Sequence, residues 1–481
     1  MRYLLCFFIH FLFSGHSGKQ VVHGAGDAVG PVRPAAAVRD SLPKIMVGEG
    51  EYQVFYLDQN RHWFGSGGNL NTLGVNKAGR PGLAIPVSVT PSDLTFKTVA
   101  GSLHGGAAID TDGYVWTVGD NAQGQLGIGN REPVAVAAKV TTDSSGRPFS
   151  PVVQICAYFS GNANNGWYAI KTDGTLWIWG STLNGMRGDG TWGGMTLRPV
   201  QVPIPGGRRA KQVVAGGMLI LLCTDGTVWT CGNAERVQNA GYAAVGNAYL
   251  TLHQLTGLSD IIQVAGGISF NYALKKDGTL YGWGAYGSYM GYYAASGSGI
   301  VLPVPTVLSN IMKGLPHPIR SIVTNSVCTH VLLMDGSLWG WGDNAMGTVG
   351  NGKELDFSST EHPYSWSFRP GELLQQLPVR VVADRSDFVA VYGSSVFTFY
   401  TYAQTADGML YSWGRNKGSV LGNGVVGCTS EITARYPNSW DVTAPVVVFP
   451  LRLTRTTSDP GPYCRLHPDS SACNKCSLMR P

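Results

Sequence analysis

The chain carries little charge and no large cluster of either sign. Of its 481 residues only 14% are Asp, Glu, Lys or Arg, and the net charge is +5. A nucleic-acid-binding protein is expected to gather basic residues along one face. The densest basic spot here, Arg208-Arg209 with Lys211, is short and typical of a solvated turn. We therefore expect no nucleic-acid partner.

The sequence also lacks the short motifs of common enzymes. It contains no His-Glu-x-x-His zinc motif, no phosphate-binding Gly-x-x-x-x-Gly-Lys-Ser/Thr and no Gly-x-Ser-x-Gly nucleophile motif. Gly-x-Gly-x-x-Gly occurs twice, at Gly188-Gly190-Gly193 and Gly422-Gly424-Gly427, but within repeated loops rather than between a strand and a helix. Single histidines such as His104 and His330 precede hairpin strands and are expected to be structural. We predict no catalytic residue, cofactor or metal ligand, and so a protein that is not an enzyme.

Long apolar runs are missing except at the N-terminus. Arg2 precedes the apolar run Tyr3 to Phe13, and Gly15 and Ser17 follow with the spacing of a cleavage site. This pattern predicts a secretory signal peptide over residues 1–17, with a buried N-terminal strand as the alternative. Residues 18–43 are typical of a leader or linker. We expect a secreted or extracytoplasmic protein without a transmembrane segment.

The nine cysteines leave several alternatives open. Cys223 and Cys231 flank one hairpin, so they are either buried thiols or a cross-strand disulfide. Cys473 and Cys476 lie in a tail over residues 454–481 together with Cys464. A metal knuckle or redox pair would need a second ligand pair that the sequence lacks, so an oxidised structural tail is favoured.

What the chain has in abundance is glycine, 65 residues, set between apolar runs. In the stretch Ala107 to Gly129 an apolar run ends in Asp-Gly and an aromatic run follows, which predicts a hairpin with a two-residue turn whose positive φ angles Asp-Gly would supply. The turn recurs, after an altered first copy at Asn60-Arg61, at Asp112-Gly113, Asp173-Gly174, Asp225-Gly226, Asp277-Gly278, Asp335-Gly336 and Asp407-Gly408. A ring of these carboxylates could suggest a metal or catalytic site, but turn chemistry accounts for each of them.

Each copy has an opening strand, the two hairpin strands and a closing strand near a proline, and there are seven copies over residues 44–453. Hairpin strands such as Leu176 to Trp179 and Leu338 to Trp341 carry large apolar groups on both faces. An open solenoid would need polar end caps, whereas a closed ring covers both faces of every sheet. The expected fold is therefore all-β, a seven-bladed β-propeller of four-stranded blades.

The repeats resemble the regulator of chromosome condensation repeat family. The match is carried by the apolar strand, Asp-Gly, the aromatic residue and the loop Gly-x-Asn-x-x-Gly-x-Leu-Gly-x-Gly, most clearly in Asp112 to Gly129, Asp335 to Gly352 and Asp407 to Gly424. The resemblance implies a seven-bladed propeller whose loops grip a protein partner. Members include exchange factors for small GTPases, signalling domains and a secreted bacterial inhibitor of β-lactamases.

Function is expected where the copies differ. Loop aromatics that the repeat does not require are candidates for partner contacts or for stacking on sugar rings. They are Trp192, Tyr286, Tyr289, Tyr292, Tyr293, Tyr364, Trp366 and Trp440. We predict a secreted, monomeric, non-enzymatic scaffold that binds a protein or a glycan. The alternatives are an exchange factor for a small GTPase and a propeller enzyme acting on polysaccharide.

Overall fold

The structure is a computed structural model, and the placed strands run from residue 48 to residue 447. The residues that it describes are 48–50, 53–57, 60–67, 83–88, 94–159, 165–183, 185–216, 218–233, 248–267, 269–285, 290, 301–344, 347–352, 374–393, 398–415, 421 and 442–447. The predicted signal peptide, the leader and the C-terminal tail lie outside these residues, so the domain boundaries stay predictions.

The described strands form seven four-stranded antiparallel sheets, each made of four consecutive strands. The first three sheets are β1 (Gly48–Gly50), β2 (Gln53–Leu57), β3 (Trp63–Gly67) and β4 (Leu83–Ser88); β5 (Phe96–Ser102), β6 (Gly105–Asp110), β7 (Val115–Gly119) and β8 (Val134–Val140); and β9 (Val152–Phe159), β10 (Asn165–Lys171), β11 (Leu176–Ser181) and β12 (Met195–Val202).

The other four sheets continue in chain order. They are β13 (Ala210–Ala215), β14 (Met218–Cys223), β15 (Val228–Asn233) and β16 (Ala248–Gln254); β17 (Ile261–Gly266), β18 (Phe270–Lys275), β19 (Leu280–Gly284) and β20 (Leu302–Val307); β21 (Ile319–Thr324), β22 (Cys328–Leu333), β23 (Leu338–Asp343) and β24 (Leu374–Arg380); and β25 (Phe388–Tyr392), β26 (Tyr400–Thr405), β27 (Leu410–Gly414) and β28 (Val442–Val447). A single-turn 3-10 helix (Pro205–Gly207) and α1 (Ser309–Lys313) connect neighbouring sheets.

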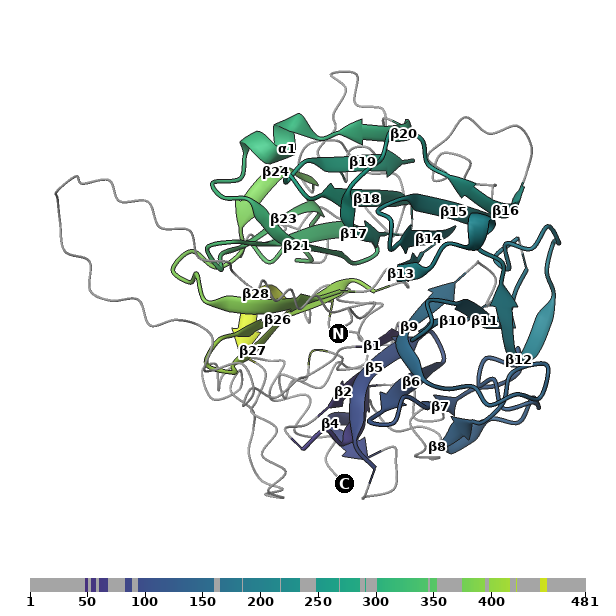
Figure 1. Ribbon diagram of the computed structural model, residues 1–481. Helices are drawn as coiled ribbons and strands as arrows, with labels where there is room; N and C mark the ends of the chain where they lie inside the picture. The colour runs from purple at the N-terminus through teal and green to yellow at the C-terminus, as the bar shows by residue number, and fades with distance from the viewer. Residues whose placement is uncertain are drawn as a thin grey trace, which may run out of the picture.

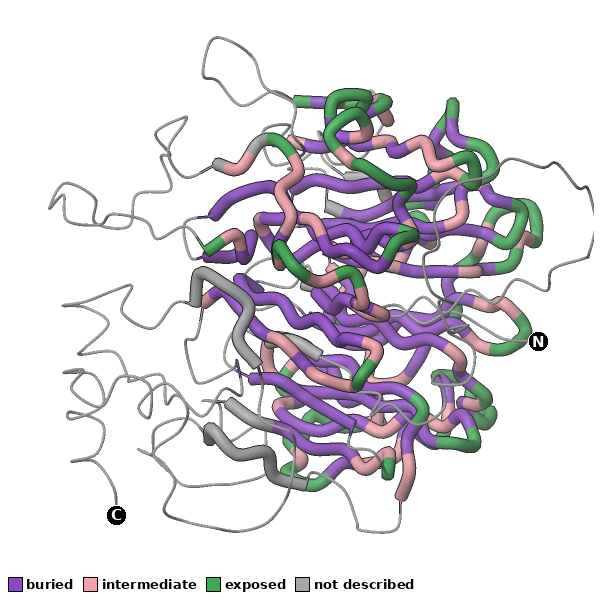
Figure 2. Tube along the Cα trace, turned by 90° about the vertical axis from the view of Figure 1, so that its left-hand side faces the viewer, coloured by how far each residue is buried: buried purple, intermediate pink, exposed green. Residues whose placement is uncertain are grey.

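The sheets stand around a common centre as the blades of a propeller. Figure 1 shows first strands such as β5, β13 and β17 toward the middle and fourth strands such as β8, β12 and β20 toward the rim. Burial decreases toward the rim: the second strands β6 and β14 are buried throughout, whereas the fourth strands β8 and β20 include several exposed residues. The exposed segments in Figure 2 gather at the connections. The prediction of an all-β propeller built from four-stranded blades is confirmed.

The hydrophobic cores lie between blades rather than within one. One cluster, for example, packs Ile220 and Leu222 of the fourth blade against Ala273 and Trp283 of the fifth. The large apolar residues on both faces of the hairpin strands therefore serve two seams, one on each side of their blade. This is why the alternating Leu and Trp pattern has no polar face.

Buried glutamines on the innermost strands link consecutive blades. The Gln212 side chain on β13 donates Nε2–H to the Val264 carbonyl at 3.1 Å and accepts the Val264 N–H on Oε1 at 3.0 Å. Gln154 makes the same pair of bonds to Val213, and Gln263 makes it to Ile322. Each amide thus pairs with the next blade as a strand would. These residues were not predicted, although the sequence carries a Gln in the opening strand of copies three, four and five.

We expect Gln212→Met to destabilise the protein by about 1–3 kcal/mol, because the apolar side chain leaves the buried Val264 N–H without its acceptor. Urea unfolding followed by tryptophan fluorescence measures this. Gln201→Met on the exposed rim strand β12 is the matched control, expected within about 0.5 kcal/mol of the wild type. Equal stability of the two variants would contradict an inter-blade role for Gln212.

The first and last blades are joined by side chains. The Tyr400 hydroxyl donates to the Gln53 carbonyl at 3.1 Å, and the Tyr56 and Tyr402 hydroxyls lie 3.2 Å apart. The question that the sequence left open, whether the final strand completes the last blade or pairs with the first copy, is answered for β28, which pairs with β27. In the described chain each blade is therefore made of its own strands, and side chains join the two ends of the array.

Candidate interaction surface

The glycine-rich loops of the second and sixth blades are each organised by their own asparagine. Asn121 is buried, accepts the Leu126 N–H on Oδ1 at 2.9 Å, and donates Nδ2–H to the Asn130 and Glu132 carbonyls at 3.0 Å. Asn344 accepts the Val349 N–H in the same way. The side-chain amides of Asn121 and Asn344 are therefore hydrogen-bonded within their own loops and shape them.

The loop glycines allow each loop to lie on the tryptophan of the following blade. A Cβ on Gly127 would come within 2.8 Å of the Trp179 ring, and one on Gly350 would come within 2.6 Å of the Trp413 ring. The indole N–H groups bond to the same loops, Trp179 to the Gln125 carbonyl at 3.1 Å and Trp413 to the Thr348 carbonyl at 3.0 Å. Both glycines have positive φ, which only glycine adopts readily. The motif therefore serves blade-to-blade packing.

Trp192 is the candidate contact residue that the structure describes. It lies in loop 182–194 between β11 and β12 and is 52% exposed. The loop base is closed by the Thr182 N–H bonding to the Gly194 carbonyl at 2.7 Å, and the Trp192 carbonyl accepts the Gly185 N–H at 3.1 Å. The Trp192 ring is thus exposed to solvent on a loop whose backbone is held by hydrogen bonds.

Polar groups of the same loop hold it in place next to the following blade. Arg187 and Asp189 form an ion pair at 2.8 Å, and the Asp189 carboxylate also accepts the Thr191 N–H and hydroxyl. The Gly190 N–H bonds to the Leu250 carbonyl of β16 at 2.7 Å. Met195, at the start of β12, is 41% exposed and adds apolar surface to this part of the rim. Loop 182–194 therefore combines an exposed indole with a charged pair, a composition typical of protein contact sites.

The other predicted contact aromatics lie outside the described residues. They are Tyr286, Tyr289, Tyr292, Tyr293, Tyr364, Trp366 and Trp440. Their role as a contact surface stays a prediction.

The Asp-Gly turns have a different geometry from the predicted one. The Gly113 N–H bonds to the Asp110 carbonyl and the Asp110 N–H to the Tyr114 carbonyl, which makes a three-residue loop with only the glycine at positive φ. The other five turns repeat this pattern. The predicted two-residue turn is wrong, because a type I turn followed by a left-handed glycine also matches the twist of the strands and needs positive φ at one position only.

The turn aspartates accept hydrogen bonds across their own loops. Asp173, Asp225, Asp277, Asp335 and Asp407 each accept the N–H two residues ahead on Oδ1. Asp112 differs, because Asp110 takes over its role and accepts the Asp112 and Tyr114 N–H groups. The backbone and hydroxyl bonds from Thr279, with the Lys275 ammonium, lower the pKa of Asp277 to about 2. Among the described residues no group of His, Cys, Asp and Glu could hold a metal ion.

On the side of the hairpin turns, aromatic rings pair with cations. Lys139 lies 3.3 Å over the Tyr114 ring, and Arg208, which pairs with Asp225 at 2.9 Å, lies 5.1 Å over the Trp229 ring. The predicted basic spot, which lies between β12 and β13, is thus partly neutralised by the aspartate of the following hairpin turn.

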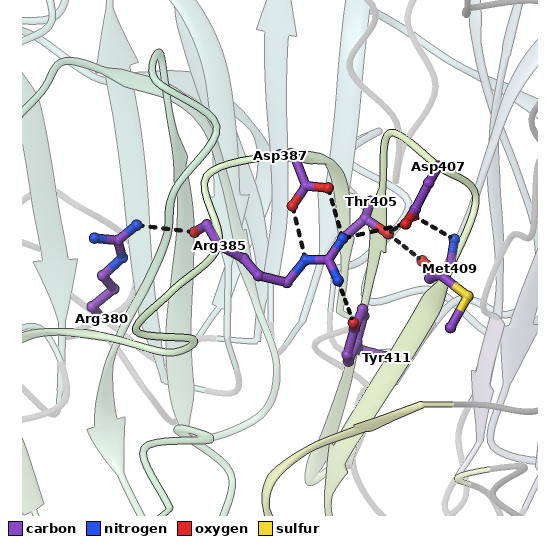
Figure 3. A network of polar contacts seen from close by, with 7 residues as sticks. All are labelled: Arg380, Arg385, Asp387, Thr405, Asp407, Met409 and Tyr411. Carbon is purple, nitrogen blue, oxygen red and sulfur yellow. Dashed lines mark hydrogen bonds and ion pairs between the residues drawn. The ribbon is translucent and has the colours of Figure 1, made fainter.

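The most extensive such network centres on Arg385 (Figure 3). Its guanidinium binds both oxygens of Asp387, at 2.9 and 2.7 Å, and donates to the Tyr411 hydroxyl at 2.8 Å. Asp407, from the hairpin turn, lies 3.4 Å from the same guanidinium. The hydrogen bonds from Arg385 to Asp387 raise the pKa of the guanidinium. These hydrogen bonds and ion pairs join Arg385 and Asp387, in the connection between β24 and β25, to Asp407 and Tyr411 of the hairpin in the last blade.

The four described cysteines are buried, and so is one of the five described histidines, His330. His330 is buried and its Nε2 lies 3.2 Å from the Val349 carbonyl, and burial lowers its pKa to about 4. Cys223 and Cys231 are separate buried thiols, because the register pairs Cys223 with Ala210 and Cys231 with Leu219. The disulfide alternative for this hairpin is therefore wrong. Burial raises the pKa of Cys223 to about 11.

Comparisons with known proteins give relatives at low identity. No protein-family model matches the chain. The E3 ubiquitin-protein ligase HERC2 of Homo sapiens is 25% identical over 349 residues, 70% of this chain but 7% of that protein's length. The ultraviolet-B receptor UVR8 of Arabidopsis thaliana is 25% identical over 350 residues, 70% of this chain and 73% of the receptor.

Among solved structures, yeast RCC1 (Prp20) bound to Kap60 superimposes with a TM-score of 0.60 at 20% identity, covering 92% of each chain. No described helix has the length and apolar character needed to cross a membrane. The sequence relatives support the RCC1 β-propeller family for this chain, and the Prp20 structure shows the same fold.

Proposed function

We propose that the chain is a secreted, non-enzymatic binding scaffold. It contacts a protein partner through the loop side of the propeller, meaning the side that carries loop 182–194 and lies opposite the Asp-Gly hairpin turns. The single observation that carries this is Trp192, an indole 52% exposed on a loop whose backbone is hydrogen-bonded at its base. Tryptophan is enriched among the residues that dominate binding energy at protein interfaces, and a preordered loop lowers the entropy lost on binding.

We also propose that the complete disc has seven blades. Seven four-stranded sheets are placed, and the tyrosines of the last sheet bond to the first. Such a ring leaves no end sheet exposed, so every loop is carried on a rigid support. Electron microscopy of the purified protein viewed along the disc axis would show the number of blades.

The binding proposal predicts that Trp192→Ala weakens partner capture by about tenfold or more, since truncating a hot-spot residue costs about 2 kcal/mol or more. Chemical cross-linking in extracellular medium, followed by mass spectrometry, identifies a partner of the wild type. Titration of that purified partner then compares the variants.

Met334→Ala is the matched control, because Met334 is 65% exposed but lies in a hairpin turn on the opposite side. It is expected to keep wild-type affinity. Equal affinity of the Trp192 variant would contradict the assignment of the loop side. Sequencing the mature N-terminus tests export, and recovery of an uncleaved chain bound to a small GTPase in cytosol would instead support an exchange-factor role.

A further inference from the structure

Loop 182–194 carries an arginine that is paired through one edge of its guanidinium only. The Nε atom of Arg187 lies 2.8 Å from Oδ2 of Asp189, and Oδ1 of Asp189 accepts the N–H and the hydroxyl of Thr191. This chain of contacts ends at the residue before Trp192, so the guanidinium is anchored to the segment that carries the exposed indole. Among the described residues no acceptor binds Nη1 or Nη2 of Arg187, and these two atoms are not buried, whereas Nε is.

Another arginine of the fold shows how the second edge is used when an acceptor is present. Arg385 is also paired with an aspartate two residues ahead, Asp387. Its guanidinium donates in addition to the Tyr411 hydroxyl at 2.8 Å and lies 3.4 Å from the Asp407 carboxylate. One guanidinium thus binds two carboxylates at once in this protein. Arg187 repeats the first half of the arrangement, and the described chain supplies no second half.

The surface around the open edge leaves room for a partner. A Cβ added at Gly194 would meet no atom within 4 Å, and one at Gly190 would meet only the methyl group of Thr251, at 3.8 Å. Loop 182–194 and β16, which it contacts, contain one acidic residue in total, Asp189, whose two oxygens are already paired. No further carboxylate of these two segments therefore competes for the Nη edge.

We propose that Arg187 binds a carboxylate of the partner protein, from an Asp or Glu that stands next to an apolar residue packing on Trp192. This inference rests on the proposed function and names what the loop recognises. A carboxylate fits because a guanidinium presents two parallel N–H groups to it, and the ion pair with Asp189 holds the arginine in place before binding. A cationic partner group is disfavoured, because the available edge of the ion pair is its positive one.

The test titrates the whole protein, labelled with 5-fluorotryptophan, with two capped peptides, acetyl-Leu-Glu-Leu-amide and acetyl-Leu-Gln-Leu-amide. Fluorine NMR follows the indoles, and Trp192→Phe identifies the Trp192 resonance among those of the 13 tryptophans. We expect a saturable shift of this resonance and about fivefold tighter binding of the Glu peptide, the usual effect of a partly exposed ion pair. Added salt should reduce the preference, because it screens exposed charges.

Arg187→Met is expected to remove the preference, so that both peptides bind as weakly as the Gln peptide binds the wild type. An unchanged Trp192 resonance in the free variant shows that the loop is intact. Arg187→Lys, which keeps the charge but not the planar pair of donors, is expected to retain only part of the preference. Arg209→Met is the matched control, because Arg209 is exposed on the hairpin-turn side, where its carbonyl accepts the Thr224 N–H. It is expected to keep the full preference.

Three results would overturn the inference: no saturable shift of the Trp192 resonance, equal affinity of the wild type for the two peptides, or a preference for Glu that survives in Arg187→Met. Because the Glu and Gln peptides are compared on the unaltered protein, a folding defect in a variant cannot decide the outcome. Capture of a partner through Trp192 without a Glu preference would refute this inference alone. A Glu preference without any recovered partner would count against the scaffold alone.

Discussion

Trp179→Ala is expected to lower the free energy of unfolding by about 3–5 kcal/mol, the usual cost of truncating a fully buried tryptophan. Trp179 is completely buried in the third blade, where its ring supports Gly127 of the preceding loop and packs edge-on against Phe149 at 5.6 Å. Its removal leaves a cavity between two blades and also removes the donor to the Gln125 carbonyl. Both effects act on one seam of the ring.

Urea unfolding of wild type and variant, followed by far-ultraviolet circular dichroism, measures this loss. Trp192→Ala is a matched control, since it truncates the same residue type at an exposed position and is expected to change stability by about 0.5 kcal/mol or less. Equal loss of unfolding free energy in the two variants would contradict a role for Trp179 in stabilising the contact between blades. It would also contradict the packing role assigned to Gly127.

Acidification is expected to destabilise the protein by about 3 kcal/mol between pH 6.5 and pH 4 through His330 alone. His330 is fully buried at the seam between the sixth and seventh blades, with the Trp413 ring centroid at 5.2 Å. Burial lowers its pKa from 6.5 to about 4. The unfolded chain therefore takes up a proton first as pH falls, so the stability from the neutral imidazole is complete above pH 6.5, is lost below it, and changes no further below about pH 4.

The groups around this imidazole do not compensate for a charge. Cys328 Sγ lies 3.9 Å from Nδ1 and the Thr401 hydroxyl 3.5 Å from it, and neither is anionic near neutral pH. Unfolding midpoints across this pH range should therefore shift less in His330→Asn, whereas His253→Gln, at an exposed position, should keep the wild-type dependence. An unchanged pH dependence in the His330 variant would show that other groups cause the loss of stability at low pH.

The repeat pattern predicted the architecture because the same local chemistry occurs in every copy. Asp-Gly between two apolar runs was enough to place the hairpins, and the apolar character of both faces of Leu338 to Trp341 was enough to predict covered sheets. The turn type was predicted incorrectly, since sequence does not distinguish a two-residue loop from a three-residue loop that ends in a left-handed glycine. Local spacing determines that a turn exists, while strand pairing determines its register.

The candidate surface was predicted only in part. Trp192 was found from sequence because the repeat does not need it, and its exposure is visible only in the structure. The other seven predicted contact aromatics lie outside the described residues, so their role stays a prediction. Sequence can single out a loop aromatic, but its exposure depends on packing between blades, which no local pattern records.

The sequence by itself determined the strands, the hairpins and the four-strand unit, because propensity, turn chemistry and hydrophobic period act over a few residues. Only the tertiary structure decided that a loop glycine supports the tryptophan of the next blade and that Gln212 completes the backbone pairing of a neighbour. Each of these depends on contacts between residues about fifty positions apart, and such contacts form only when whole blades pack together.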